Sequence, residues 1–439
     1  MKKDKQDFPT DYRGPAQMIE VQEDVPAAFL AIVLRKEETD HQAEQRGQEL
    51  LSLVTTMGLK SVGYMFIPIR SANSATLIGS GKVTELFEEA SNTGAGIIIF
   101  DCDLNPRVQR NLEQATGLCV IDRQEVILQI FANRAQTKEA KLQIELARLE
   151  YSLPRLTRAW TNLSRQHGGV KGTKGEGETQ LELDRRIVQA KISQIKKELQ
   201  KVKTQRNSQR KQRMEHQVPN VAIVGYTNSG KSSLLRRLTG ADVLVEFKLF
   251  ATLDTTSKQV NLPDGNRIIL TDTVGFVSDL PHQLVESFKS TLEEATYADA
   301  LLIVCDASHP DMLGCYETTR QVLEELGCKD KPTVTLINKM DAVEDTFSIS
   351  RLKSMVPDAL EVSVKQDKDM TKVLDALEDV CYGNLPLVTY VIPAEKQDLI
   401  AYLHRTAKIE DIIYADRTVT LSCRIKPCHE GPVKQFHQQ

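Results

Sequence analysis

The sequence contains no apolar run of the roughly 20 residues that a helix needs to cross a bilayer. Its N-terminus, MKKDKQDFPTDYRGP, is charged and contains proline, and no apolar stretch follows that could act as a signal peptide. From these absences we expect neither a membrane-spanning protein nor a secreted one. We expect a soluble, cytoplasmic protein.

Paired cysteines and a strong net charge are also missing. The eight cysteines are scattered without a CxxC spacing, and Cys423 with Cys428 and His429 has no second ligand pair in range. We therefore expect reduced, structural cysteines. The formal net charge is −4 over 439 residues, so only a local cluster of charge could indicate a nucleic-acid partner.

Strands and helices alternate in the first part of the chain. Apolar runs at 27–35, 60–70, 95–101 and 118–122 are predicted as strands, and the segments between them have helical periodicity. Such alternation is typical of a small parallel sheet with helices on its faces.

Two long helices are predicted next. Apolar residues recur at helical spacing from Gln124 to Leu156, where Pro154 fits the end of one long helix. After the glycine-rich loop GGVKGTKGEGE (168–178), a second helical run has a seam close to heptad spacing. The two helices imply an antiparallel hairpin with a flexible tip.

The distal part of this hairpin is basic. Residues 196–213 contain eight Lys or Arg against one Glu. The run is either a solvated helix face or linker, or an arm that contacts nucleic-acid phosphates. Positive character extends towards the glycine-rich loop through Arg155, Arg158, Arg165, Lys171 and Lys174.

A phosphate-binding loop follows the hairpin. GYTNSGKSS (225–233) has two glycines separated by four residues and followed by Lys-Ser, and it lies between an apolar strand and a helix. Backbone N–H groups from Asn228 to Ser232 would surround the phosphates. Lys231 would neutralise the β and γ phosphates, and the Ser232 hydroxyl would ligate Mg²⁺.

Two further segments complete a triphosphate switch. In RIILTDTVGF, Asp272 ends a strand where it can hold the water shell of magnesium, and Gly275 leaves room for a backbone N–H to meet the γ phosphate. In FATLDTTSK, Thr252 offers a second metal-ligating hydroxyl while a triphosphate holds the loop closed. We predict catalytic roles for Lys231, Thr252 and Gly275.

The base is predicted from TVTLINKMD and EVSVK. Asp341 can accept the N1–H and the 2-amino group of guanine, whereas adenine has neither donor and would leave the carboxylate unpaired. Ser363, Val364 and Lys365 follow where backbone N–H groups can meet the guanine O6. The sequence therefore predicts an enzyme that hydrolyses GTP to GDP and phosphate. Phe276 replaces the glutamine that commonly orients the attacking water, so we expect slow hydrolysis without a partner.

With these motifs in place, the chain resembles the HflX family of GTPases from about residue 27 to the end of the nucleotide domain. The most specific stretches are IGSGKVTEL (78–86), DLNPRVQRNLE (103–113), the run from Ile121 to Tyr151, and GEGETQLELDRR (175–186). The resemblance implies a ribosome-associated GTPase that binds the large subunit, points its hairpin into the subunit's RNA and dissociates ribosomes under stress. We expect a monomer away from the ribosome.

The resemblance also implies the contacts of the nucleotide and its metal. Magnesium falls on Ser232 and Thr252, with Asp272 acting through water. The sequence departs from the family's usual pattern at GTKGEGE in the tip, at TLDTTSK and at Val364. The nucleotide contacts are Gly225, Tyr226, Thr227, Asn228, Ser229, Gly230, Lys231, Ser232, Phe250, Ala251, Thr252, Leu253, Asp254, Asp272, Thr273, Val274, Gly275, Asn338, Lys339, Met340, Asp341, Ser363, Val364 and Lys365.

We predict an α/β fold. A phosphate-loop GTPase domain, with a mostly parallel sheet and helices on both faces, is preceded by a small α/β domain with a long helical hairpin. A small α+β domain follows it. The predicted divisions are a mobile N-terminal arm (1–24), an N-terminal α/β domain (25–123), the hairpin (124–216), the GTPase domain (217–384) and the C-terminal domain (385–439).

Two alternative functions remain open on the sequence alone. One is an RNA remodeller that uses ATP as readily as GTP. The other is a protein-interaction switch without a ribosomal role, whose basic hairpin is only a spacer.

Overall fold

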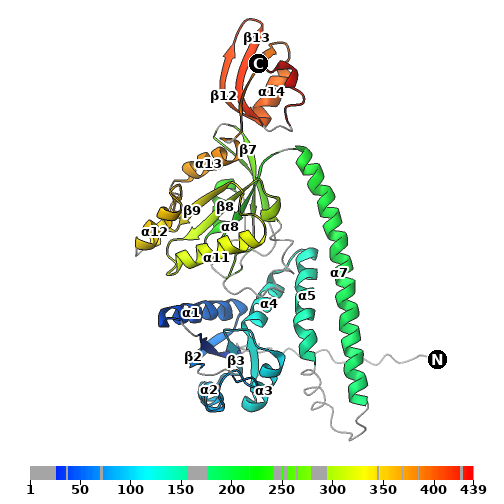
Figure 1. Cartoon of the computed structure of the whole chain (residues 1–439), viewed down its shortest axis with the longest axis vertical. Coiled ribbons are helices and arrows are strands. Elements are labelled where there is room, and N and C mark those ends of the chain that lie inside the picture. Colours follow the sequence, from blue (N-terminus) through cyan, green and yellow to red (C-terminus); the bar gives the residue numbers. More distant parts are fainter. Residues whose placement is uncertain are drawn as a thin grey trace, which may run out of the picture.

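Three sheets follow one another along an elongated molecule, and a long helix lies beside the first two (Figure 1). The computed structural model describes residues 26–35, 38–69, 73–156, 176–216, 218–240, 250, 256–263, 265–277, 294–343, 346–367, 369–383, 385–425 and 429–438. Several sequence predictions lie outside these residues: those for Ala251, Thr252, Leu253, Asp254, Arg158, Arg165, Lys171 and Lys174.

The first sheet is four-stranded and parallel, as predicted, with the order β2-β1-β3-β4. Because side chains alternate along a strand, Ala28 and Leu30 pack with α1 and α4, whereas Phe29 and Ala31 pack with α2 and α3. The elements are β1 (Ala27–Leu34), α1 (Asp40–Met57), β2 (Lys60–Pro68), α2 (Ser80–Asn92), β3 (Ile97–Phe100), α3 (Pro106–Thr116), β4 (Cys119–Asp122) and α4 (Arg123–Arg134). We call these elements the N-terminal unit.

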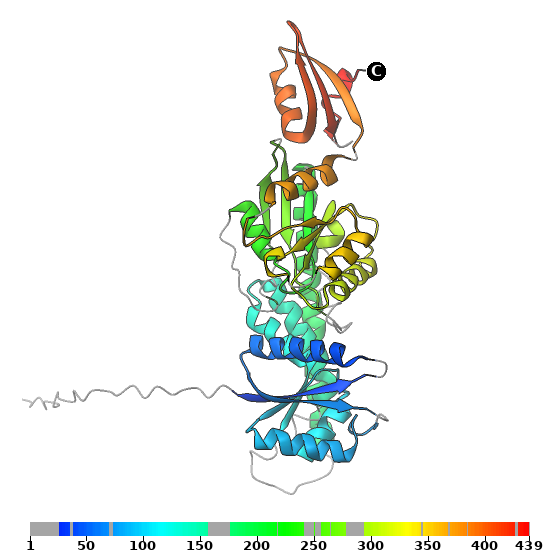
Figure 2. The ribbon, with the colours of Figure 1, turned by 90° about the vertical axis from the view of Figure 1, so that its left-hand side faces the viewer.

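Helix α1 has defined signals at both ends. The Thr39 side chain accepts a hydrogen bond from the Gln42 N–H, and the Gln42 side chain accepts one from the Thr39 N–H, so a capping box begins the helix. Gly58, with φ of 92°, ends it in the left-handed conformation. Figure 2 shows α1 on the side of the N-terminal sheet that faces the second sheet.

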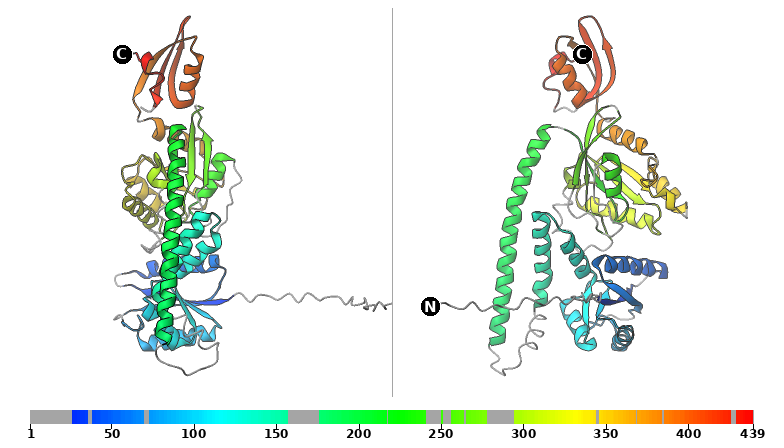
Figure 3. Two further views of the ribbon diagram at one scale, coloured as in Figure 1. Left: turned by 90° about the vertical axis from the view of Figure 1, so that its right-hand side faces the viewer. Right: turned by 180° about the vertical axis from the view of Figure 1, so that it is seen from behind.

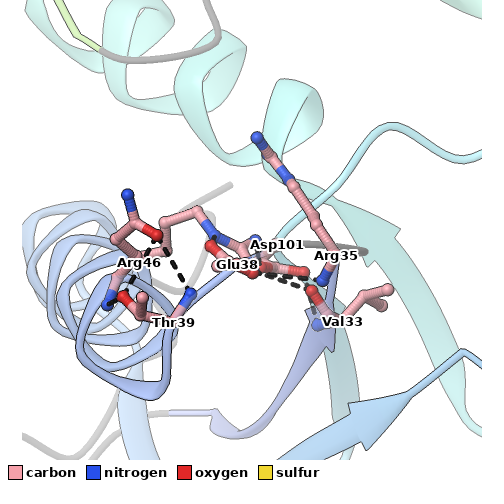
Figure 4. Close-up of polar contacts among 7 residues, drawn as sticks. Val33, Arg35, Glu38, Thr39, Arg46 and Asp101 are labelled. Atoms are coloured by element: carbon pink, nitrogen blue, oxygen red, sulfur yellow. Dashed lines mark hydrogen bonds and ion pairs between the residues drawn. The ribbon is translucent and has the colours of Figure 1, made fainter.

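A buried ion-pair network joins α1 to the carboxyl ends of β1 and β3 (Figure 4). The Arg46 guanidinium donates to both carboxylate oxygens of Glu38, to the Val33 carbonyl and to Asp101. Asp101 also accepts the Val33 N–H at 2.9 Å. Burial raises the pKa of Asp101, although the Val33 N–H and Arg46 oppose the rise. Each of the charged groups in this network at the edge of the sheet therefore has a hydrogen-bond partner.

The prediction of one helix from Gln124 to Leu156 is wrong, because the chain turns between α4 and α5 (Lys138–Ser152). Ala135 is extended, and the Thr137 side chain accepts the Ala140 N–H as the N-cap of a new helix. Between Phe131 and Leu142 the only apolar residues are alanines, and the capping signal of Thr137 marks the break. A short 3₁₀ turn, η1 (Leu153–Arg155), follows α5 and contains Pro154.

Helix α5 pairs with α7 (Glu176–His216) to form the hairpin (Figure 3). The chain descends through α5 and returns through α7, as predicted for an antiparallel pair. Lys191 forms an ion pair with Glu145 at 2.6 Å, and Lys196 forms one with Glu150 at 2.7 Å. Part of the positive charge of α7 is therefore used within the hairpin.

The second sheet has the order β10-β9-β8-β5-β7-β6, and only the β6–β7 pair is antiparallel. Helices α8 and α13 cover one face, while α11 and α12 cover the other, so the predicted layers are confirmed. The elements are β5 (Asn220–Val224), α8 (Lys231–Thr239), β6 (Thr256–Asn261), β7 (Arg267–Asp272), β8 (Ala300–Asp306), α11 (Met312–Glu325), β9 (Thr333–Asn338), η2 (Met340–Ala342), α12 (Phe347–Met355), β10 (Leu360–Glu361), α13 (Met370–Glu378) and the turn η3 (Asp379–Gly383).

The third sheet is antiparallel, with the order β11-β13-β12, and α14 packs against it. Its elements are β11 (Leu387–Pro393), α14 (Gln397–Thr406), β12 (Ala407–Tyr414), β13 (Thr418–Ile425) and η5 (Lys434–Phe436). This mixture of strands and a helix agrees with the predicted small α+β domain. Within the described residues, no helix combines the length and apolar character that crossing a membrane requires.

Candidate functional site

The phosphate loop connects β5 to α8, and its shape depends on two glycines. Gly225 has φ of 149° and lies against the Val304 carbonyl of β8, while Gly230 has φ of 99° and lies against the Asn338 amide. A Cβ atom at either position would overlap these neighbours. The loop therefore lies against the carboxyl ends of β5, β8 and β9. Ligands bind at this edge in doubly wound sheets.

Lys231 begins α8 and is 6% exposed. Its ammonium donates to the carbonyls of Gly225 at 3.1 Å and Tyr226 at 2.7 Å. Burial lowers the pKa of Lys231 to about 8, against the opposing effect of Asp272. The buried hydroxyls of Thr227 and Ser229 have no hydrogen-bond partner among the described residues. The loop thus presents a cation and unused polar groups, as expected where a ligand supplies acceptors.

Two oxygen donors meet at the predicted metal position. The Ser232 hydroxyl donates to the Asp272 carboxylate at 2.6 Å, and Asp272 is fully buried at the end of β7. Hydroxyl and carboxylate oxygens are the donors that Mg²⁺ prefers. The oxygens of Ser232 and Asp272 are therefore suitable ligands for this ion. The third predicted ligand, Thr252, lies outside the described residues.

The predicted base-binding segments come together at the ends of β9 and β10. The Asn338 side chain donates to the Ser229 carbonyl at 2.9 Å and accepts the Val364 N–H at 3.2 Å, so it links this end of the site to the phosphate loop. The Ser363 hydroxyl donates to Asp341 at 2.6 Å. This hydrogen bond lowers the pKa of Asp341, whose side chain is 11% exposed. The carboxylate is therefore fixed in its charged, accepting form.

Lys339 lies between these residues and has φ of 64°. Its ammonium pairs with Asp306 at 2.6 Å, which fixes the left-handed turn against the end of β8. Met340 and Asp341 then begin the short turn η2. Lys365 is 86% exposed and lies 4.0 Å from Asp341.

The segment after Asp272 is tied directly to the phosphate loop. The Phe276 N–H donates to the Gly225 carbonyl at 3.1 Å, and the Thr227 N–H donates to the Phe276 carbonyl at 2.7 Å. A Cβ atom at Gly275 would lie 2.7 Å from the Thr227 Cα, so only glycine fits there. Thr273 anchors the segment by donating to the Ile223 carbonyl at 2.7 Å.

The Phe276 side chain is 1% exposed and belongs to a core cluster that also contains Leu50 and Phe131 of the N-terminal unit. Phe250 belongs to the same cluster, and its ring meets Phe131 edge to face with centroids 4.6 Å apart. The Phe276 side chain therefore packs in the core between the N-terminal unit and the second sheet. It supplies no group that could orient water.

Replacing Phe276 with glutamine is expected to destabilise the protein without accelerating GTP hydrolysis. The amide would enter an apolar cluster, at a cost of about 2 to 4 kcal/mol. Denaturant unfolding and steady-state GTP turnover of Phe276→Gln, each compared with the wild type, measure the two effects. A tenfold faster turnover at unchanged stability would show that this side chain can reach the nucleotide.

The sequence did not identify the N-terminal residues that touch this site. Glu49 of α1 accepts a hydrogen bond from Tyr226, and Phe131 of α4 packs on Phe250. The sequence feature that could have indicated such a contact is Tyr226 itself, a large aromatic residue inside a phosphate loop.

Arg155 was predicted to extend the positive character of the hairpin towards the glycine-rich loop, and the structure corrects this. Its guanidinium donates to Asp122 at 3.2 Å, to the Leu104 carbonyl at 2.8 Å and to Gln109 at 2.9 Å, and it lies over the Tyr151 ring. Its side chain is 12% exposed and Asp122 is fully buried. Arg155 therefore fixes the root of the hairpin to the N-terminal unit.

The sheet order, the phosphate loop, the paired Ser232 and Asp272, and the Asn338–Asp341 segment together define a P-loop GTPase. Three family descriptions match successive parts of the chain: "GTP-binding GTPase N-terminal" at 44–132, "GTP-binding GTPase Middle Region" at 134–213 and "50S ribosome-binding GTPase" at 220–339. Two similar relatives are both named "GTPase HflX". The protein from Treponema denticola is 48% identical over 76% of this chain and 87% of its own length, and the one from Akkermansia muciniphila is 42% identical over 88% and 91%.

The chain belongs to the HflX family of GTPases, as the sequence motifs predicted. Among solved structures, it is similar to a GTP-binding protein from the archaeon Sulfolobus solfataricus in complex with GDP. That match has 25% identity, covers 81% of this chain and 99% of the other, and has a TM-score of 0.44.

Proposed function

We propose that this GTPase is a factor of the large ribosomal subunit, which it binds through the N-terminal unit and the α5–α7 hairpin in a GTP-dependent manner. One of the family descriptions that match the chain names a 50S ribosome-binding GTPase. The protein acts in ribosome dissociation, rescue or biogenesis, and it is cytoplasmic and partly ribosome-associated. It is a monomer when it is not bound to a ribosome.

The proposed nucleotide contacts run from one end of the site to the other. Asp341 accepts the donors of guanine, and the backbone from Ser363 to Lys365 meets the guanine O6. Amides of the phosphate loop and the Lys231 ammonium hold the phosphates, while the Gly275 N–H meets the γ phosphate. Magnesium, held by Ser232 and Thr252 and through water by Asp272, would neutralise charge on the phosphates.

Catalysis by these residues is mainly positioning and electrostatic stabilisation. Lys231 and the loop amides stabilise the charge that develops on the transferred phosphoryl group. The Phe276 side chain does not orient the attacking water, because it is apolar and buried in the core. A group that does so is therefore expected from a partner or from elsewhere in the chain, and purified protein alone is expected to turn GTP over far more slowly than tens of times per second.

The observation that carries the ribosomal role is the set of exposed cations on α7. Lys191 and Lys196 are paired within the hairpin, but four others are exposed and have no ion-pair partner among the described residues. These four, which we call the α7 cations, are Arg185, Arg186, Lys197 and Lys201. Exposed cations on a long helix, without ion-pair partners among the described residues, fit a phosphate backbone.

Neutralising the α7 cations by substitution with glutamine is expected to weaken binding to the large subunit and to make it less salt-dependent. Each lost phosphate contact lowers the slope of log affinity against log salt by about one. Co-sedimentation with large subunits at several salt concentrations, with GDP, GTP and a non-hydrolysable GTP analogue, measures both effects. We expect the analogue to give the tightest binding.

The matched control neutralises four exposed cations elsewhere: Lys258, Arg267, Arg351 and Lys434. Equal binding by wild type, α7 variant and control at every salt concentration would indicate that the hairpin is a spacer. The protein-interaction switch would then be the better account of the chain.

A further inference from the structure

Tyr226 is the second residue of the phosphate loop, yet its side chain leaves the second sheet and reaches the N-terminal unit. It is 7% exposed, and its hydroxyl donates to the Glu49 carboxylate of α1 at 2.5 Å. The two residues are 177 positions apart in the chain. A hydrogen bond to a charged acceptor is among the stronger ones, and here water is largely excluded.

Glu49 is itself held in place by a second residue of the N-terminal unit. Arg123, the first residue of α4, pairs with the other Glu49 oxygen at 3.0 Å. The side chains of Arg123 and Glu49 are 5% and 16% exposed. Both Glu49 carboxylate oxygens are therefore engaged, one by Tyr226 of the phosphate loop and the other by Arg123 of α4. The acceptor of the Tyr226 hydroxyl thus has a fixed position.

The Tyr226 backbone connects this contact to the nucleotide site. Its carbonyl accepts from the Lys231 ammonium at 2.7 Å, and its two neighbours, Gly225 and Thr227, form the backbone hydrogen bonds with Phe276. Tyr226 and Phe276 form an isolated parallel bridge. A shift of the Tyr226 side chain therefore moves the anchor of Lys231 and the start of the segment that contains Gly275.

From these contacts we infer that Glu49 is a positioning residue for the phosphate loop. Held by Arg123, it fixes the Tyr226 hydroxyl and keeps the loop in the shape that retains a nucleoside diphosphate. Movement of α1 away from the loop releases Tyr226 and speeds the loss of GDP. The inference rests on the proposed contacts between the phosphate loop and the nucleotide.

The test is the rate at which fluorescently labelled GDP dissociates from the full chain. Tyr226→Phe removes only the hydroxyl, and Glu49→Gln removes the charge that Tyr226 and Arg123 share. We expect each variant to release GDP about three- to thirtyfold faster than the wild type. Because both changes break one contact, the double variant is expected to match the faster single variant. Glu44→Gln, an exposed glutamate on the same helix, is the matched control and leaves the rate unchanged.

Thermal unfolding of the nucleotide-free variants separates positioning from general stability. A merely structural contact would lower the melting temperature and leave the GDP dissociation rate at the wild-type value, which overturns the inference. Effects of the two single variants that multiply in the double variant also overturn it, since Tyr226 and Glu49 would then act independently. If the wild type fails to bind GDP, the proposed nucleotide site is wrong as well, whereas normal binding with unchanged release in both variants contradicts the inference alone.

Discussion

Asp341→Asn is expected to weaken GDP binding by at least about 100-fold and to improve the binding of xanthosine diphosphate (XDP). The carboxylate accepts two donors of guanine, and an asparagine amide presents a donor in place of one acceptor. Xanthine carries a carbonyl where guanine carries its 2-amino group, so the amide complements xanthine. One hydrogen bond to a charged group, worth about 1.5 to 3 kcal/mol, is lost, and the remaining one is weakened because its acceptor becomes neutral.

The surroundings of Asp341 make this expectation specific. The Ser363 hydroxyl holds one carboxylate oxygen at 2.6 Å and lowers the pKa of Asp341, so the wild-type group is charged throughout the neutral range. Equilibrium competition of GDP, XDP and ADP against labelled GDP measures the preference. Asp358→Asn, which changes an exposed aspartate of the same sheet region, is the control and leaves the preference unchanged. Full retention of guanine selectivity by Asp341→Asn would contradict the assignment of the base.

Arg46→Met is expected to cost about 3 to 5 kcal/mol of the stability of the N-terminal unit. The substitution keeps most of the side chain's length and removes the charge that neutralises Glu38 and Asp101. Both carboxylates would then remain in a largely buried place, since their side chains are 10% and 0% exposed. Removing one partner of a buried ion pair is far more damaging than removing an exposed one.

Denaturant unfolding of the full chain, followed by circular dichroism, measures this loss as an earlier first transition. Lys82→Met is the matched control, because Lys82 forms a pair with Glu85 in which the side chains are 37% and 49% exposed. That variant is expected to lose less than about 1 kcal/mol. Equal losses in the two variants would contradict the importance of the buried network.

The sequence predicted the sheets and the nucleotide segments because both depend on local patterns. The phosphate loop and the segments that begin at Asp272 and Asn338 lie at the ends of the apolar strands β5, β7 and β9, and parallel strands bring their carboxyl ends to one edge. Gly225, Asp272 and Asn338 could therefore be placed together without tertiary information. The small α+β C-terminal domain was likewise predicted from local patterns.

Other features depend on contacts between distant segments or on competing local signals. The break between α4 and α5 was missed because helical apolar spacing resumes at Leu142, although Thr137 caps the second helix. Arg155 was assigned to the surface because its partner, Asp122, is 33 positions away. The contact of Tyr226 with Glu49 joins residues of different sheets, and no spacing in the sequence indicates it.

The most direct test of the account is the competition of GDP and ADP for the full chain in the presence of magnesium. Because Asp341, held by Ser363, lies where it can accept two guanine donors that adenine lacks, we predict that ADP binds at least about 100-fold more weakly than GDP. Equal competition by ADP would contradict the guanine site.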